Sequence, residues 1–510
     1  MGYAEFDLTV PVGSGYDELR AAIRRTVKTE TFTFDILLKS LDARKKNRIV
    51  WSYRVGVNSP ALGGAAPAPA PRLEHDQVGK GRRIVVVGTG PAGLFSALYL
   101  ARSGFKVTVL ERGGRVEARK EAIDAFEAGG AFSAANNYCF GEGGAGTFSD
   151  GKLSSRTKGI NAERNYVYDA FISAGAPDEI RYMTHPHLGS DLLFGMTARL
   201  RGLLLEAGCE LVYDTRFLSL AEYGSGTVRS IHTDAGDLDA HAFVLAVGHS
   251  AYETHRSLIS SGVPYRVKNF ALGFRAEHAQ EIINHAQWGV PALPEVKAAE
   301  YRLTAQAGQT GVYTFCMCPG GTVVQASAYG DASVVNGKSD YARDGLYANA
   351  AVVAGVDLAR LTGRDMRAED ALDWLEDLER RFKDTSGWKV PAMTVRDFLN
   401  GRSGSPLEKT SYAHGLAPAD LAELLPAGLV APLREGLSSF CSKLRGFDTG
   451  TIMGLESKTS APIQAERDAG TLCSGYDNLY LAGEGSGWSG GIVSSAADGL
   501  RVAQAICGRS

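Results

Sequence analysis

The chain has 510 residues, a formal net charge of −3, 44% hydrophobic residues and 22% charged residues. This composition excludes a disordered chain, and the balanced charge gives no electrostatic basis for binding nucleic acid or an anionic membrane. No apolar run reaches the roughly 18 residues of a membrane span, and acidic residues stand where a signal peptide has basic ones. Seven scattered cysteines fit a reducing compartment. We therefore expect a cytoplasmic protein.

Three blocks follow one another along the chain. Residues 1–57 show the pattern of a strand, an amphipathic helix and two more strands, which predicts a small N-terminal β-α-β-β domain. Residues 58–81 are rich in Ala, Pro and Gly and predict an extended linker. From residue 82 onward, strand-like and helix-like segments alternate, which indicates an α/β architecture.

The strongest motif begins with a short apolar run at residues 84–87. Three glycines follow as G-x-G-x-x-G: Gly88 for the tight turn, Gly90 for close approach of a pyrophosphate, and Gly93 for packing of the next helix on the strand. The helix that begins with Pro91 and Ala92 then presents free N–H groups of its first turn to the phosphate, although Pro91 itself has none. A second strand ends at Glu111, near the spacing expected of an acid that binds ribose hydroxyls. The sequence therefore predicts a dinucleotide-binding Rossmann unit.

Separated segments extend this motif into a family resemblance. They are LERGGRVEAR after the fingerprint, CELVYDTRFLSL at 209–220, HAFVLAVGHSA at 241–251 and NLYLAGEGSGWSGGIVSSAADGL near the C-terminus. Together they resemble the flavoproteins that have two dinucleotide-binding domains. The resemblance implies that Phe217 meets the adenine and that the Gly483-Glu484 pair meets the ribityl chain. It also implies that the helix following Glu484 faces the isoalloxazine, so the expected cofactor is FAD.

Further segments narrow the resemblance. They are GEGGAGTFSDGKL at 141–153, HPHLGSDLL at 185–193, CMCPGGTVV at 316–324, VVNGKS at 334–339, ESKTSAPI at 456–463 and SLDARKK in the N-terminal unit. The chain is similar over nearly its whole length to a largely uncharacterised bacterial family of FAD-dependent dehydrogenases. Lys338, Lys458 and Trp488 stand where that family more often has Met, Arg and Tyr.

The expected fold is α/β, with a Rossmann-like FAD-binding domain, an inserted substrate domain and the small N-terminal domain. We assign residues 82–250 and 445–510 to the FAD-binding domain and residues 251–444 to the substrate or cap domain. The expected FAD contacts are Gly88, Gly90, Pro91, Ala92, Gly93, Glu111, Arg112, Gly144, Gly146, Thr147, Phe217, Ala246, Gly248, Gly483, Glu484, Gly490, Gly491 and Ile492.

Three residues are candidates for a catalytic role. The five glycines within residues 141–151 favour a loop that wraps the flavin closely, and Lys152 at its end would stabilise a reduced anionic flavin. His187 and His249 are candidates because imidazole titrates near neutral pH. A structural role for each histidine is the competing interpretation. We predict no metal site, and we interpret Cys316 and Cys318 as a strand that ends in a turn rather than a redox pair.

The predicted function is an FAD-dependent oxidoreductase that transfers hydride to or from a small organic substrate. No second G-x-G-x-x-G stands in the same strand–turn–helix context, so the electron donor or acceptor stays open. A flavin monooxygenase and an RNA-associated flavoprotein are the alternatives, the latter disfavoured by the net charge of −3.

Overall fold

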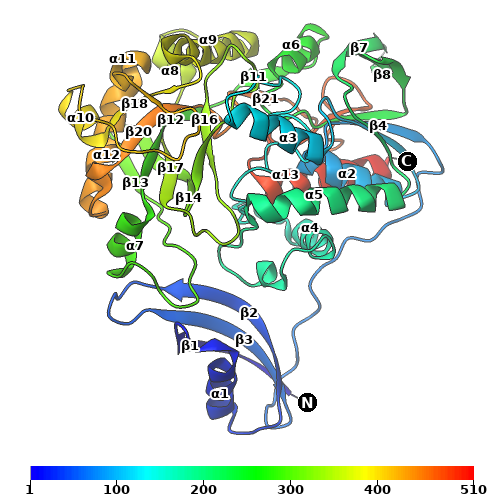
Figure 1. Ribbon diagram of the computed structural model, residues 1–510. Helices are drawn as coiled ribbons and strands as arrows, with labels where there is room; N and C mark the ends of the chain where they lie inside the picture. The colour runs from blue at the N-terminus through cyan, green and yellow to red at the C-terminus, as the bar shows by residue number, and fades with distance from the viewer. Residues whose placement is uncertain (1, 225, 510) are drawn as a thin grey trace.

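The computed structural model describes residues 2–224 and 226–509. Its N-terminal unit has the expected β-α-β-β order and forms an antiparallel sheet with strand order β1-β3-β2. The elements are β1 (Gly2–Pro11), α1 (Gly15–Val27), β2 (Thr33–Asp42) and β3 (Val50–Ser59). Leu19, Ile23 and Val27 of α1 are buried against this sheet, as expected of an amphipathic helix, whereas Tyr16 is 59% exposed. Figure 1 shows this unit, in blue, below the two larger ones.

A five-stranded parallel sheet forms the second unit, in the order β22-β10-β4-β5-β6. Its strands are β4 (Arg83–Val87), β5 (Lys106–Leu110), β6 (Glu210–Val212), β10 (Ala242–Leu245) and β22 (Leu479–Leu481). Its helices are α2 (Pro91–Arg102), α3 (Val116–Glu127), α4 (Asn161–Ser173), η1 (Asp178–Arg181), α5 (Gly189–Glu206), α6 (Tyr252–Ser260) and α13 (Ile492–Gly508). A separate antiparallel sheet contains β7 (Phe217–Gly224), β8 (Thr227–Thr233) and β9 (Gly236–Asp239).

The central helix α2 is buried from Ala92 to Ala101 because α13 packs directly against it. The approach is close: a Cβ added at Gly499 of α13 would lie 2.1 Å from the carbonyl oxygen of Ala92. Through this contact the C-terminal helix lies beside the first turn of the Rossmann unit, although about 400 residues separate them in sequence. Both helices are visible together in Figure 1.

The third unit is built on a seven-stranded sheet in the order β13-β14-β17-β12-β20-β18-β19. Its strands are β12 (Phe270–Ala279), β13 (Thr304–Ala307), β14 (Thr310–Cys318), β17 (Tyr347–Val356), β18 (Val390–Thr394), β19 (Leu416–Pro418) and β20 (Thr451–Glu456), with the hairpin β15 (Thr322–Gln325) and β16 (Val335–Lys338) packed beside it. Its helices are α7 (Gln280–Trp288), α8 (Leu358–Thr362), α9 (Ala368–Ser386), α10 (Val395–Asn400), α11 (Leu421–Leu424), α12 (Ala427–Lys443) and η2 (Phe447–Thr449).

Two expected boundaries differ from the structure. Helix α6 lies within residues 251–444, the stretch assigned from sequence to the substrate or cap domain, but it packs against β7 beside the parallel sheet. Strand β20 lies within residues 445–510, the stretch assigned from sequence to the FAD-binding domain, but it pairs with β12 and β18 of the seven-stranded sheet. After it, β21 (Ile463–Ala465) pairs with β11 (Tyr265–Val267), and the chain rejoins the parallel sheet only at β22. This second boundary depends on the pairing of β12 with β20, whose residues are almost 180 positions apart, so no local sequence pattern predicts it.

The N-terminal unit contacts both larger units. The Lys39 backbone N–H donates to Tyr182 O at 2.7 Å, and Thr184 N–H donates to Lys39 O at 3.0 Å. On the other side, Ile49 is buried in the core of the seven-stranded unit. Among the described residues, no helix has both the length and the apolar character needed to cross a bilayer.

Candidate functional site: a dinucleotide cradle and an adjoining polar cluster

The three glycines of the fingerprint have different structural roles. Gly88 has a φ of +99°, and a Cβ there would lie 2.4 Å from Ala246 O. A Cβ at Gly93 would lie 1.9 Å from Gly88 O, so any side chain there would break the packing of α2 on the turn. At Gly90 the nearest atom to an added Cβ is the Gly144 Cα, at 3.9 Å. The fold therefore requires glycine at Gly88 and Gly93, whereas Gly90 leaves open space beside the α2 N-terminus.

Glu111 follows β5 and is 5% exposed. One carboxylate oxygen accepts the Thr89 N–H at 3.1 Å and the Thr89 hydroxyl at 2.5 Å. The other accepts the N–H groups of Gly113 and Gly141, both at 3.1 Å. The carboxylate thus connects the turns that contain Thr89, Gly113 and Gly141. It also lies where a ribose-binding acid is expected.

The loop at 141–147 lies against the fingerprint turn. A Cβ at Gly144 would be 2.8 Å from the Gly90 Cα, and one at Gly146 would be 3.1 Å from Ile492 Cγ1. The buried Arg119 of α3 holds this loop, because its Nη1 donates to Glu142 O at 2.9 Å and to Gly144 O at 2.8 Å. The sequence analysis did not single out Arg119, although it is the last residue of the LERGGRVEAR run.

The C-terminal segment completes this region. A Cβ at Gly483 would lie 2.7 Å from Ala92 Cβ, so this glycine permits close contact with α2. Gly491 caps α13 with a φ of +97°, and its N–H is directed to the Glu484 carboxylate. Burial raises the pKa of Glu484 to about 7, against the effect of that N–H and of Lys268. The structure therefore gathers Gly90, Pro91, Ala92, Gly144, Gly146, Gly483, Glu484, Gly490, Gly491 and Ile492 around the N-termini of α2 and α13.

The other predicted contacts have mixed positions. Ala246 and Gly248 follow β10, beside the Gly88 turn. Thr147 is buried, with its hydroxyl 3.4 Å from Thr197 Oγ1, and Phe217 is 3% exposed within an apolar core. Arg112 is directed elsewhere: its Nη1 donates to Glu253 at 2.7 Å and its guanidinium lies 3.8 Å from the Phe140 ring centroid. These last contacts give Arg112 partners within the protein.

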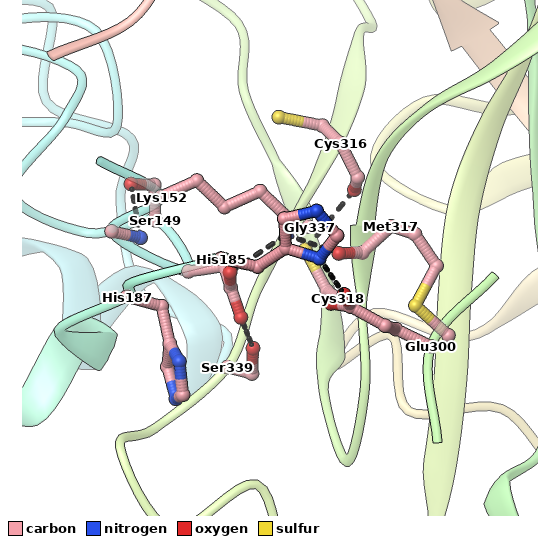
Figure 2. A network of polar contacts seen from close by, with 12 residues as sticks. Ser149, Lys152, His185, His187, Glu300, Cys316, Met317, Cys318, Gly337 and Ser339 are labelled. Atoms are coloured by element: carbon pink, nitrogen blue, oxygen red, sulfur yellow. Dashed lines mark hydrogen bonds and ion pairs between the residues drawn. The ribbon is translucent and has the colours of Figure 1, made fainter. Parts of the chain in front are cut away.

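Beyond the glycine loop lies a polar network that we call the junction cluster, shown in part in Figure 2. It consists of Asp150, Lys152, His185, His187, Lys297, Glu300 and Arg343. Asp150, 2% exposed, accepts from Lys152 Nζ at 2.7 Å and from Arg343 Nη2 at 2.8 Å. Lys152 also donates to Met317 O of the seven-stranded sheet. The cluster therefore joins the end of the glycine loop to the third unit, and the Lys152 charge is already paired with a carboxylate.

The structure places the two candidate histidines in different surroundings. His187 belongs to the junction cluster, and its backbone pairs with that of Lys152. Its Nε2 lies 3.2 Å from Tyr341 O, and burial lowers its pKa to about 4. His249 lies near Lys458 and His255; burial lowers its pKa to about 3, and its buried Nε2 has no hydrogen-bond partner among the described residues. His187 therefore has a polar, partly accessible setting, whereas His249 does not.

Cys316 and Cys318 end strand β14 before a turn, as predicted from sequence. Both are free thiols, and the Arg275 Nη2 holds the Cys316 carbonyl at 2.7 Å. Cys316 has a φ of +43° at a register shift in the strand, and Figure 2 shows its sulfur pointing away from the polar contacts. Among the described residues, no group of three or more His, Cys, Asp or Glu side chains is arranged to hold a metal ion.

The three residues that depart from the family pattern all make polar contacts. Lys338 Nζ donates to Tyr138 OH at 2.7 Å, and the buried Lys458 lies 2.9 Å from Glu379 Oε1. Trp488, 47% exposed, donates its indole N–H to Ala465 O at 2.8 Å. The structure thus gives each of them a defined local partner.

Comparisons with known proteins identify the family. Residues 269–459 match the model of the FAD-dependent protein C-terminal domain, and residues 86–131 match an NAD(P)-binding Rossmann-like domain. An uncharacterised protein of Clostridium beijerinckii is 37% identical over 504 residues, covering 94% of this chain and 93% of its own length. The chain belongs to this family of FAD-dependent proteins. It is a flavoprotein of oxidoreductase type, and its cofactor is FAD.

Solved structures give remoter likenesses. A geranylgeranyl bacteriochlorophyll reductase-like protein of Thermoplasma acidophilum is 12% identical with a TM-score of 0.37, over 83% of this chain and 77% of its own. A variant of the halogenase PltM in complex with FAD is 10% identical with a TM-score of 0.39, over 84% and 69%. Identities and TM-scores this low bring no function to this chain.

The residues of the cradle fit FAD. The space at Gly90 adjoins free N–H groups at the α2 N-terminus, which suits a pyrophosphate. Beside it, the buried Arg119 Nη2 has no hydrogen-bond partner among the residues that the structure describes, which suits a nearby anion. Gly90, Pro91 and Ala92 would hold the pyrophosphate, and the turns at 144–146 and 490–492 would hold the flavin end.

Proposed function

We propose that this protein transfers hydride between bound FAD and a small organic substrate at the junction cluster. One observation carries the proposal: the glycine loop that lies against Gly90 and Ile492 ends at Lys152, which is already part of the cluster. Acid–base side chains thus stand within a few residues of the expected flavin contacts. Bound FAD supplies a hydride donor or acceptor; the chain supplies position and proton transfer.

His187 is the proposed proton acceptor. Its Nε2 lies 3.2 Å from Tyr341 O, a carbonyl that can only accept, so we assign the ring proton to Nε2 and the lone pair to Nδ1. With the pKa lowered to about 4 by burial, the ring is neutral at pH 7 and Nδ1 is free to take a proton. Lys297 Nζ, 3.5 Å from Nε2, also lowers the pKa of His187, because its charge disfavours a positive charge on the ring.

Lys152 is proposed to position rather than to exchange a proton. Its Nζ bridges Asp150 and Met317 O, so it fixes the end of the glycine loop against β14. Lys152→Met removes one cation near the expected flavin position. We expect a lower flavin reduction potential, because a cation stabilises the reduced anion, and little change in FAD content, because the cradle is separate. A reduction potential equal to that of the wild type would remove Lys152 from flavin tuning.

The test of the function is anaerobic photoreduction of the purified protein, followed by mixing with a panel of organic acceptors and nicotinamides. A dehydrogenase transfers its electrons to an organic partner, and a deuterated donor slows the step. The His187→Gln variant should photoreduce normally but react with the organic partner about 10²-fold more slowly. The matched control His285→Gln changes an exposed histidine of α7 and should react as the wild type does.

Two outcomes would overturn the proposal. Oxygen consumption coupled to an oxygenated product would make the protein a monooxygenase. Equal rates in the His187 and His285 variants would exclude His187 as the proton acceptor. Loss of FAD from the His187 variant would be visible separately in its absorbance, so a folding defect is not mistaken for a chemical one.

A further inference from the structure

Two adjoining cavities lie where the linker crosses α4, away from the cradle and the junction cluster. The first has a volume of about 310 Å³ and is lined by Arg72, Arg102, Tyr166 and Asp169, among others. The second, of about 230 Å³, shares Arg72 and Asp169 with the first and adds Arg164 and Arg181. The first volume lies at the lower end of the range for ligand pockets and the second lies below it, which indicates a small ligand.

The charges that line these cavities do not balance. Four arginines face one aspartate, which leaves three positive charges, although the whole chain carries −3. Among the residues that the structure describes, Arg181 alone of these four arginines forms an ion pair, with Asp169 at 2.5 Å. Arg102 donates to the neutral Tyr166 hydroxyl at 3.1 Å, and Arg164 to the neutral Asn161 side chain at 3.0 Å.

Arg72 lines both cavities and makes no hydrogen bond or ion pair with any residue that the structure describes. The backbone on either side of it is nevertheless anchored. Asn165 donates to Pro71 O at 3.1 Å, and the Tyr99 hydroxyl donates to Glu74 O at 2.8 Å. The chain thus holds an unpaired guanidinium in a fixed segment between two basic cavities.

We propose that the two cavities form a binding site for a small phosphorylated ligand with at least two anionic groups, a diphosphate being the minimal form. Guanidinium groups bind phosphate oxygens in a bidentate manner, and two cavities that share Arg72 suit two linked phosphates. The Tyr166 ring has edge contacts with His75 and Tyr99, and the Arg102 guanidinium lies over it at 5.8 Å, so part of its surface is already engaged within the protein. Together with the small volumes of the cavities, this favours a phosphate site over a nucleic-acid surface.

The experiment is a calorimetric titration of the FAD-loaded protein with inorganic pyrophosphate, at an ionic strength held constant with sodium chloride. FAD fills the glycine cradle, so binding there does not compete. We expect one binding event, weakened about tenfold or more when Arg72→Gln and Arg164→Gln are combined. The matched control is Arg302→Gln, another exposed arginine without a partner among the described residues, and it should bind as the wild type does.

Trypsin provides a second readout. Pyrophosphate should slow cleavage after Arg72, and Arg164→Gln should reduce this protection at the same pyrophosphate concentration. The proposal fails if pyrophosphate gives no heat, if the double variant and Arg302→Gln bind equally, or if a single-stranded RNA oligonucleotide binds through these arginines more tightly than pyrophosphate. None of these outcomes depends on the reaction proposed at the junction cluster.

Discussion

Thr89 directs both its backbone N–H and its hydroxyl to one carboxylate oxygen of Glu111, at 3.1 and 2.5 Å. The second oxygen accepts two further backbone N–H groups, from Gly113 and Gly141. A residue predicted as a ribose ligand is therefore also the group that organises the cradle. Its two roles separate experimentally, because one concerns FAD binding and the other concerns the apoprotein.

Glu111→Gln places an amide NH₂ against two of these donors. We expect the free energy of unfolding of the apoprotein to fall by about 2 kcal/mol, since a buried N–H left without an acceptor costs about 1–3 kcal/mol. Urea unfolding checks this. Glu117→Gln, which breaks an ion pair in which Glu117 is 50% exposed, should cost less than about 1 kcal/mol. Equal losses in the two variants would contradict the organising role of Glu111.

Valine substitutions at Gly90 and Gly93 should have different effects, the first on FAD binding and the second on folding. Gly90→Val should fold and lose FAD, because the added side chain enters open space that the pyrophosphate needs. Gly93→Val should fail to fold the Rossmann unit, since even its Cβ would lie 1.9 Å from Gly88 O. Visible flavin absorbance and circular dichroism distinguish the two outcomes. A Gly90→Val protein that retains its full complement of flavin would place the pyrophosphate elsewhere.

His187 gives the protein a pH-dependent stability of known sign. Its pKa is about 4 in the folded protein and near 6.5 in the unfolded chain, so between these values the unfolded chain binds more protons. Its contribution is full above pH 6.5 and is lost as the pH falls to about 4, by up to about 3 kcal/mol. His187→Gln should flatten this part of the stability curve, whereas His285→Gln should not.

Glu484 acts with the opposite sign in the apoprotein. Its folded pKa of about 7 lies above the ordinary 4.5, so the folded state retains a proton that the unfolded chain releases. Stability is therefore lost as the pH rises from about 4.5 to about 7. Glu484→Gln should be more stable than the wild type at pH 8, by about 2–3 kcal/mol, with the gap closing near pH 4.5. Chemical denaturation at the two pH values checks this; a constant gap would contradict the raised pKa.

The sequence alone determined the Rossmann unit, because its information is local. Gly93 is required by a contact with Gly88 within one strand–turn–helix segment, Gly88 has the positive φ of the tight turn, and Glu111 directly follows the next strand. The N-terminal β-α-β-β order is likewise predicted from the hydrophobic periodicity of short segments. The family resemblance then added the cofactor, through segments whose residues the fold brings together around α2 and α13.

Only the tertiary structure decided the rest, because it depends on pairings between distant residues. Strand β20 joins the seven-stranded sheet through hydrogen bonds to β12, which nothing in its own sequence specifies. The fold places Arg119 where it donates to the glycine loop, and it pairs Arg112 with Glu253. The backbones of Lys152 and His187 pair with each other, whereas His249 lies near Lys458 and His255. The sequence alone does not distinguish the surroundings of these three titratable residues. Burial and neighbouring charge separate them, and both arise only when the chain has folded.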